Sequence, residues 1–100
     1  MAFDGHNIWV ANSGSNNVTK LSSSGATLGT FPAGSGPFEL AFDGANIWVV
    51  NNGSSSVTKL RATDGAVLGT FSVGRGPLGV AFDGANIWVV NETNNTVSKL

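Results

Sequence analysis

Apolar residues along this chain occur in short runs, separated by turns rich in Gly, Asn, Ser and Asp. The run Ile47–Asn51 (IWVVN) is apolar at successive positions, which is typical of a strand covered on both faces. A shorter run, Phe38–Phe42 (FELAF), precedes it and leads into Asp43-Gly44, a dipeptide suited to the positive φ angles of tight hairpins. The pattern predicts two antiparallel strands, the second lying in a sheet stacked between two other sheets.

Two more strands are expected after this pair. Val57–Leu60 (VTKL) places apolar and polar side chains on each face, as a partly exposed strand does. Asp64-Gly65 makes the next turn, and Ala66–Val73 (AVLGTFSV) is rich in β-branched and aromatic residues. No segment has a helical period. The unit is therefore predicted to be an antiparallel meander of four strands.

This unit repeats along the chain. Ala41–Asn51 (AFDGANIWVVN) recurs as Ala2–Asn12 (AFDGHNIWVAN) and Ala81–Asn91 (AFDGANIWVVN), which divides a single domain, 1–100, into copies 2–40, 41–80 and the partial 81–100. Four strands in about 40 residues match the blade of a β-propeller. A β-solenoid is the competing architecture, but its coils are usually shorter and need no hairpin turn between successive strands. We expect an all-β chain of propeller blades that forms an incomplete ring.

The expected strand count is one short of three blades, whereas a closed propeller needs at least about four blades. The chain alone would expose two blade faces lined with the Ile, Trp and Val of the repeated strand, and such apolar faces indicate an interaction surface. The expected partner is another copy of the chain. Two chains, the favoured number, would give six blades, and three would give up to nine. A head-to-tail contact closes only if the rotation per blade fits the ring, and otherwise forms filaments.

Composition narrows the function classes. Hydrophobic residues make up 41% of the chain and charged residues 11%, which argues against disorder. The net charge is −1 and the few basic residues are scattered, so neither a nucleic-acid-binding stripe nor a basic membrane-surface segment is expected. No apolar run is long enough to span a bilayer, and the first residues lack the zones of a signal peptide. There is no cysteine, which excludes disulfides and thiolate chemistry but leaves the compartment unknown.

The combined pattern GP-x-G-x-AFDG-x-NIWV-x-N, then V-x-KL, then G-x-x-L-G-T-F-x-V-G resembles bacterial propellers of the YVTN, NHL and streptogramin-lyase-like groups, over the whole chain after Met1. The resemblance implies the fold but not the activity, because these groups include lyases, lactone hydrolases and binding scaffolds. The lyase-like members rely on a histidine, an acid and a divalent metal. The single histidine, His6, has no matching surroundings, so no catalytic, metal-binding or cofactor-binding residue is carried over. The near-identity of the copies is typical of a recently amplified or a designed array.

Two sets of repeated residues have both a functional and a structural interpretation. The tryptophans could form an aromatic rim that stacks on sugars, but their repetition at an interior strand position favours a place in the core between blades. The aspartates could form a carboxylate ring around a cation, but each precedes a glycine, where Asp accepts local backbone hydrogen bonds. The sets are Trp9, Trp48 and Trp88, and Asp4, Asp43 and Asp83.

Residues that occur in one copy only are the other candidates for chemistry. His6 replaces an alanine and is expected to be an exposed substitution; the other singular residues are Glu39, Arg75 and Glu92. They form no acid pair or metal-ligand set. The serine-rich loops have no base to activate a nucleophile, and Gly74–Pro77 leads into a strand, unlike a phosphate-binding loop.

The favoured function is a non-catalytic propeller module that assembles with itself as a scaffold. The alternatives are a fragment of a lyase- or hydrolase-type propeller enzyme, and a carbohydrate- or protein-binding propeller. An enzyme needs one special blade, whereas an assembly module tolerates equal ones. A binding propeller would use the loops of one rim, where the copies differ most. Those loops are Ser13–Asn17, Asn52–Ser56 and Glu92–Thr96, with the connections Gly34–Pro37 and Gly74–Pro77.

Overall fold

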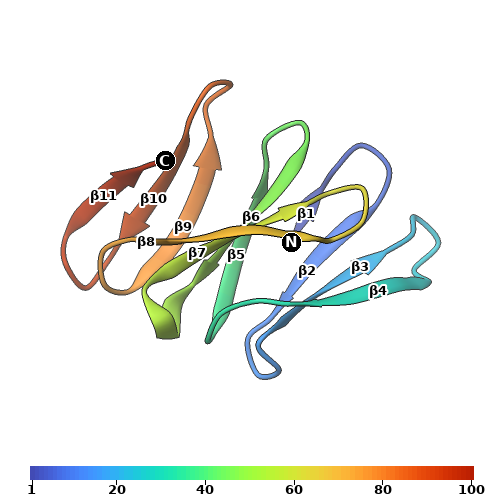
Figure 1. The fold of residues 1–100 in the computed structure, drawn as a ribbon, viewed down its shortest axis with the longest axis horizontal. Helices are drawn as coiled ribbons and strands as arrows, with labels where there is room; N and C mark the ends of the chain where they lie inside the picture. The colour runs from blue at the N-terminus through green and yellow to red at the C-terminus, as the bar shows by residue number, and fades with distance from the viewer.

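A computed structural model describes residues 1–100 as three antiparallel β-sheets, one for each copy of the repeat (Figure 1). The first sheet has the order β1 (Ala2–Phe3), β2 (Ile8–Asn12), β3 (Asn17–Leu21), β4 (Thr27–Pro32). The second has the order β5 (Pro37–Phe42), β6 (Asn46–Asn51), β7 (Ser56–Arg61), β8 (Val67–Ser72). The third contains β9 (Pro77–Phe82), β10 (Ile87–Asn91) and β11 (Thr96–Lys99), and a short 3-10 turn, η1 (Asn52–Ser54), follows β6.

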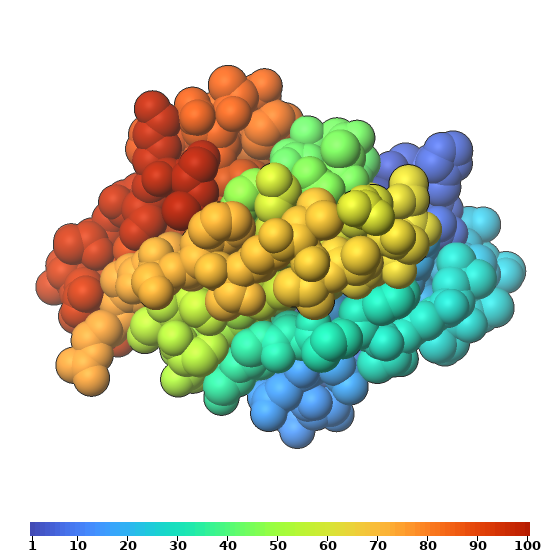
Figure 2. Space-filling model, in the orientation of Figure 1, coloured from blue at the N-terminus to red at the C-terminus, as the bar shows by residue number.

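Each sheet is a meander in which successive strands pair, so the predicted all-β blade architecture is confirmed. The three blades are stacked side by side in chain order, with the first and third at opposite ends of the molecule (Figure 2). The first strands of neighbouring blades, β5 and β9, lie next to each other, as the inner strands of a propeller do. No helix here has the length and apolar character needed to cross a bilayer.

The hairpin between β5 and β6 shows why Asp-Gly recurs. Oδ1 of Asp43 accepts hydrogen bonds from the backbone N–H groups of Ala45 and Asn46, at 2.9 and 2.7 Å. Gly44 has φ +101°, a conformation that residues with a Cβ atom rarely adopt. The corresponding aspartates of the other blades make the same backbone contacts, so the predicted turn role is confirmed.

The core consists of two clusters, each lying between two adjacent blades. In the first, Trp9 and Val18 of the first blade meet five buried residues of the second: Leu40, Ile47, Val49, Leu60 and Ala62. In the other, three residues of the second blade, Trp48, Val50 and Val57, meet Ile87 and Val89 of the third. Alternate residues of β6 therefore belong to different clusters. This confirms both the two-sided strand and the inter-blade position of the first two tryptophans.

The third strand of the middle blade differs from the expectation of partial exposure. Val57 and Leu60 of β7 are fully buried, and Thr58 is nearly so. The expectation was wrong because the neighbouring blades cover both faces of β7. The polar Thr58 hydroxyl is accommodated by a hydrogen bond from Nδ2 of Asn51, at 2.9 Å.

Candidate functional site

A stack of Asp, Trp and Lys side chains recurs in every blade. The tryptophan Nε1–H donates to Oδ2 of the aspartate five residues earlier, and the lysine directly opposite on the next strand places its ammonium over the indole ring. The three stacks are Asp4–Trp9–Lys20 (2.8 Å; 5.2 Å to the ring centroid), Asp43–Trp48–Lys59 (2.7 and 5.0 Å) and Asp83–Trp88–Lys99 (2.6 and 5.6 Å). Each stack joins a hairpin turn to the tryptophan of its blade through a charge-assisted hydrogen bond, and the lysine adds a cation–π contact.

These contacts keep the aspartates ionised. Hydrogen bonds from the Trp88 indole and from two backbone N–H groups lower the pKa of Asp83 from 3.8 to about 2. Partial burial tends to raise the pKa of Asp4 and Asp43, but the matching hydrogen bonds outweigh it, and both pKa values are lowered. A carboxylate held in this way is a poor proton donor or acceptor near neutral pH. The stacks therefore support structure rather than acid–base chemistry.

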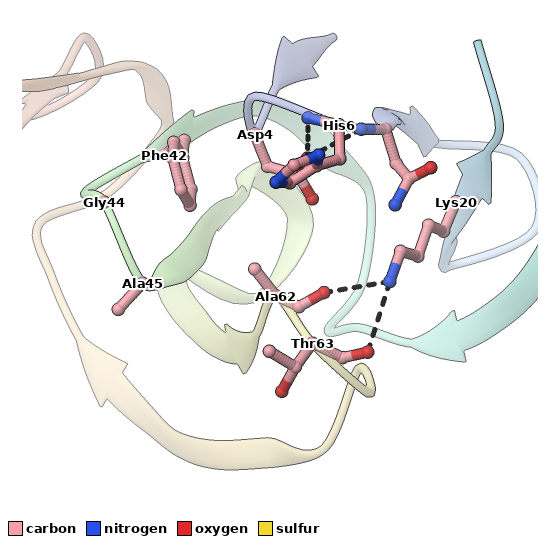
Figure 3. A pocket seen from close by; sticks show the side chains of 9 residues that line it. Asp4, His6, Lys20, Phe42, Gly44, Ala45, Ala62 and Thr63 are labelled. Atoms are coloured by element: carbon pink, nitrogen blue, oxygen red, sulfur yellow. Dashed lines mark hydrogen bonds between the residues drawn. The ribbon is translucent and has the colours of Figure 1, made fainter.

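A groove of about 410 Å³ lies between the first and second blades, on the rim formed by the Asp-Gly turns (Figure 3). Its lining from the first blade includes Asp4, His6 and Lys20, and Thr63 belongs to the second. Nζ of Lys20 crosses the groove to the backbone oxygens of Ala62 and Thr63, at 3.0 and 3.3 Å. The lysine thus joins the two blades across the groove.

His6 is exposed in this groove, as its place after the turn predicts. Its backbone N–H binds Oδ1 of Asp4, at 2.9 Å, whereas its imidazole makes no hydrogen bond. No group of three His, Cys, Asp or Glu side chains gathers anywhere in the chain. Of the polar groups around His6, the Asp4 carboxylate and the Lys20 ammonium are already engaged in contacts within the fold.

The other singular residues lie apart. Oε1 of Glu39 pairs with the N-terminal ammonium of Met1, at 3.3 Å. The side chains of Arg75 and Glu92 are exposed and make no ion pair. The structure brings no two of the four singular residues into one constellation.

The loops expected on one rim do lie together, on the rim opposite the groove (Figure 1). Much of their backbone is used to join the blades. Gly36 N–H donates to Oδ1 of Asn16, at 3.0 Å, and Asn52 N–H donates to Gly36 O, at 2.9 Å. Glu92 N–H donates to Gly76 O in the same way at the next junction. The connections between blades are therefore held by hydrogen bonds to the loops of the blades that they join.

A repeated asparagine at the end of the second strand was missed by the sequence reasoning. Asn51 is fully buried, and its Nδ2 donates to the Ser56 and Thr58 hydroxyls, at 3.2 and 2.9 Å. Its Oδ1 accepts the N–H of Gly34, at 3.1 Å, in the connection from the preceding blade. A Cβ atom at Gly34 would lie 2.8 Å from the Asn51 side chain, so the glycine permits this approach. The recurrence of Asn12, Asn51 and Asn91 was the signal that could have revealed it.

The two end faces of the molecule expose apolar side chains whose equivalents are buried in the middle blade. We call the face formed by Trp88, Val90 and Val97 the trailing face; these side chains are 39%, 51% and 60% exposed. Their equivalents in the middle blade, Trp48, Val50 and Val57, are 8%, 0% and 0% exposed.

The opposite end, which we call the leading face, is formed by Ile8, Val10 and Leu21 of the first blade. All three are partly exposed, and Phe3 beside them is exposed. Their equivalents in the middle blade, Ile47, Val49 and Leu60, are fully buried. Both end faces therefore carry the residues of an inter-blade interface without a neighbouring blade.

Comparison with known proteins identifies the fold. No protein-family model matches the chain, and no curated protein matches it by sequence. Among solved structures, it is similar to Kuenenia stuttgartiensis hydrazine synthase, with a TM-score of 0.83 and 25% identity over 91% of this chain and 27% of the other. It is also similar to a streptogramin B lyase, with a TM-score of 0.79 and 23% identity over 94% of this chain and 33% of the lyase.

A catalytically inactive virginiamycin B lyase from Staphylococcus aureus, solved with quinupristin, matches with a TM-score of 0.81 and 18% identity over 93% of this chain and 33% of that chain. The protein is thus a run of β-propeller blades. This is the fold that the sequence motifs also indicate. The chain spans about a quarter to a third of the length of these solved chains.

Proposed function

We propose that this chain is a non-catalytic propeller module that associates head-to-tail with further copies of itself. In this assembly the trailing face of one copy packs on the leading face of the next and completes the ring. The observation that carries the proposal is the exposure of Trp88, Val90 and Val97, whose equivalents in the middle blade are buried against the blade that follows.

The two end faces carry the residues of an interface that the chain already contains twice. Inside the chain, Trp48 and Val57 of one blade pack on Ile87 and Val89 of the next. The trailing face presents the same Trp and Val, and the leading face presents the same Ile and Val at Ile8 and Val10. Docking of two copies therefore repeats an existing contact between blades.

The energetics favour a ring over a single contact. Full burial of a large apolar side chain contributes about 1.5–3 kcal/mol, and the two end faces together offer several such side chains. Association costs about 4–15 kcal/mol in lost rigid-body freedom. Closure forms a second interface without a second loss of that freedom. Two chains, giving six blades, are the assembly we favour.

The alternative is that the chain contributes to a larger propeller that is an enzyme or binds a carbohydrate or protein. The solved lyases that share the fold support this alternative, as does the groove beside His6. In this alternative one blade would differ from the others at a functional position. His6 lines the groove, and the equivalent residues of the other two copies are alanines, Ala45 and Ala85. A His6→Ala variant that loses an activity or a ligand while retaining its mass in solution would favour this alternative.

Native mass spectrometry and light scattering test the assembly. The expected result is a discrete multiple of 10.2 kDa, twice that mass for the two-chain ring. A monodisperse monomer that is folded and all-β by circular dichroism would overturn the proposal. Val90→Lys should give a monomer, because it places a charge in the centre of the trailing face. Leu68→Lys is the matched control, since Leu68 is 42% exposed in a blade that is covered on both faces.

A further inference from the structure

The third blade has a bare strand edge. In the first and second blades a fourth strand, β4 or β8, pairs with the third strand. In the third blade β11 pairs with β10 alone, so its outer backbone edge has no partner strand. The acceptor strands have closely similar sequences: Val57–Leu60 reads VTKL and Val97–Leu100 reads VSKL.

The complete blades show how a fourth strand is recognised. Phe71 of β8 lies opposite Val57 and stacks on Trp48, with ring centroids 5.7 Å apart. Phe31 of β4 packs on Trp9 in the same way, at 5.6 Å. A Gly-Thr-Phe sequence therefore brings a phenyl ring onto the tryptophan of each complete blade.

The glycine of this sequence is part of the recognition. A Cβ atom at Gly69 would lie 3.1 Å from Cζ of Phe71, and at Gly29 the corresponding distance to Phe31 is 2.8 Å. The ring thus folds back over the glycine of its own strand. A larger residue there would push the phenyl ring away from the tryptophan.

The third blade already holds its tryptophan as the complete blades do. Trp88 donates to Asp83, at 2.6 Å, and Lys99 lies over its ring. Trp88 is nevertheless 39% exposed and has no phenyl partner. The acceptor side of the contact is therefore formed before any fourth strand binds.

We propose that the β11 edge and Trp88 form a binding site for an extended peptide segment of the β8 type. The segment adds as an antiparallel strand, and its phenylalanine stacks on Trp88. By analogy with β7 and β8, its Gly69, Thr70 and Phe71 positions lie opposite Lys99, Ser98 and Val97. Backbone hydrogen bonds supply affinity, and the Gly-Thr-Phe pattern supplies specificity. This site shares Trp88 with the trailing face, but it also uses the β11 edge, which the contact between blade faces does not, and it can be occupied in a single chain.

The test is an NMR titration of the chain with a synthetic peptide of residues 63–74. The chain carries Val10→Lys, which blocks the leading face and leaves β11 unchanged. The expected result is saturable binding, with amide shifts confined to 96–100 and the neighbouring β10 and a shift of the Trp88 indole N–H. Control peptides carrying Phe71→Ala or Gly69→Val should bind at least about tenfold more weakly, because each removes the stacked phenyl ring.

Absence of binding, equal binding of the three peptides, or shifts centred on β3 or β7 would overturn the proposal. Shifts at β3 or β7 would mean that the peptide displaces an existing strand. Because the titration uses a chain that cannot close a ring, its failure is independent of the head-to-tail proposal. If Val10→Lys does not fold, the same titration on Leu21→Lys, which also lies on the leading face and leaves the third blade unchanged, provides the test.

Discussion

The indole Nε1–H of Trp48 donates a hydrogen bond to Oδ2 of Asp43, five residues earlier, over 2.7 Å. Oδ1 of the same carboxylate holds the hairpin turn through Ala45 and Asn46. The Asp43 side chain therefore holds the turn and also accepts a hydrogen bond from the only polar atom of the Trp48 side chain, which is buried between blades. The same pair is present in all three blades, which explains why Asp and Trp recur at this spacing.

Replacing Asp43 with alanine should destabilise the chain by about 1–3 kcal/mol, because a buried indole N–H loses its acceptor. Urea unfolding followed by circular dichroism measures the loss. Asp64→Ala is the control, since Asp64 caps an exposed turn and accepts no indole N–H. Equal stability changes for the two variants would contradict this role of the indole bond.

Acid should unfold the chain through the same aspartates. The pKa of Asp83 is about 2 in the folded chain, and hydrogen bonds from tryptophan and backbone N–H groups also lower the pKa values of Asp4 and Asp43. A carboxyl group whose folded pKa is below its unfolded value, about 3.9, stabilises the fold when ionised. This contribution is fully present above about pH 5 and is lost as the pH falls towards about 2.

The urea midpoint should therefore be flat from about pH 7 to 5 and fall between about pH 4 and 2. Asp83→Asn should lower the midpoint near neutral pH and reduce the fall in acid. A midpoint that does not change between about pH 6 and 2.5 would show that these carboxylates do not govern acid stability.

Mixing two association-deficient variants distinguishes head-to-tail assembly from a symmetric dimer. Val10→Lys blocks the leading face and Val90→Lys blocks the trailing face, so each variant alone should be a monomer. Val10→Lys retains an intact trailing face, and Val90→Lys retains an intact leading face. An equimolar mixture should therefore form a 1:1 heterodimer, which native mass spectrometry would detect. If two like faces met instead, the mixture would contain homodimers of at least one variant.

Gly65→Ala tests the contact between the first and second blades. Gly65 has φ +75°, and a Cβ atom there would overlap the ring of Phe31 in the preceding blade. Gly44→Ala is the control, because Gly44 also has a positive φ but open space around it. Gly65→Ala should cost about 1–3 kcal/mol more than Gly44→Ala, since only the former overpacks the interface. Urea unfolding measures the difference, and equal losses would show that Phe31 moves aside freely.

The sequence allowed the blade to be predicted because its signals are local. Each Asp-Gly turn sets the length of a hairpin, and the strands between turns are short enough for their order to follow the chain. The repeat adds support to this prediction, because the same turn and strand residues occur in all three copies and one interpretation must fit each of them. The apolar run Ile47–Asn51 also indicated that neighbouring sheets cover both faces of this strand.

The functional surfaces were less predictable. The groove beside His6 combines a turn of the first blade with Thr63 of the second, so it depends on how two sheets stack. Contacts between blades, such as Asn51 with Gly34 and Lys20 with Ala62, join residues far apart in the chain. Sequence reasoning placed Gly34 in a candidate binding connection, but it predicted neither of these contacts.

The sequence by itself determined the strands, the turns and the alternation of side chains along each strand, because these depend on neighbouring residues. The strand count also indicated two exposed blade faces, but only the tertiary structure decided which copies of each repeated residue line them. Trp48 and Trp88 lie in identical sequences, yet the first is almost buried and the second is partly exposed. The reason is that burial of a blade face requires a further sheet against it, and the position of that sheet is a property of the whole assembly.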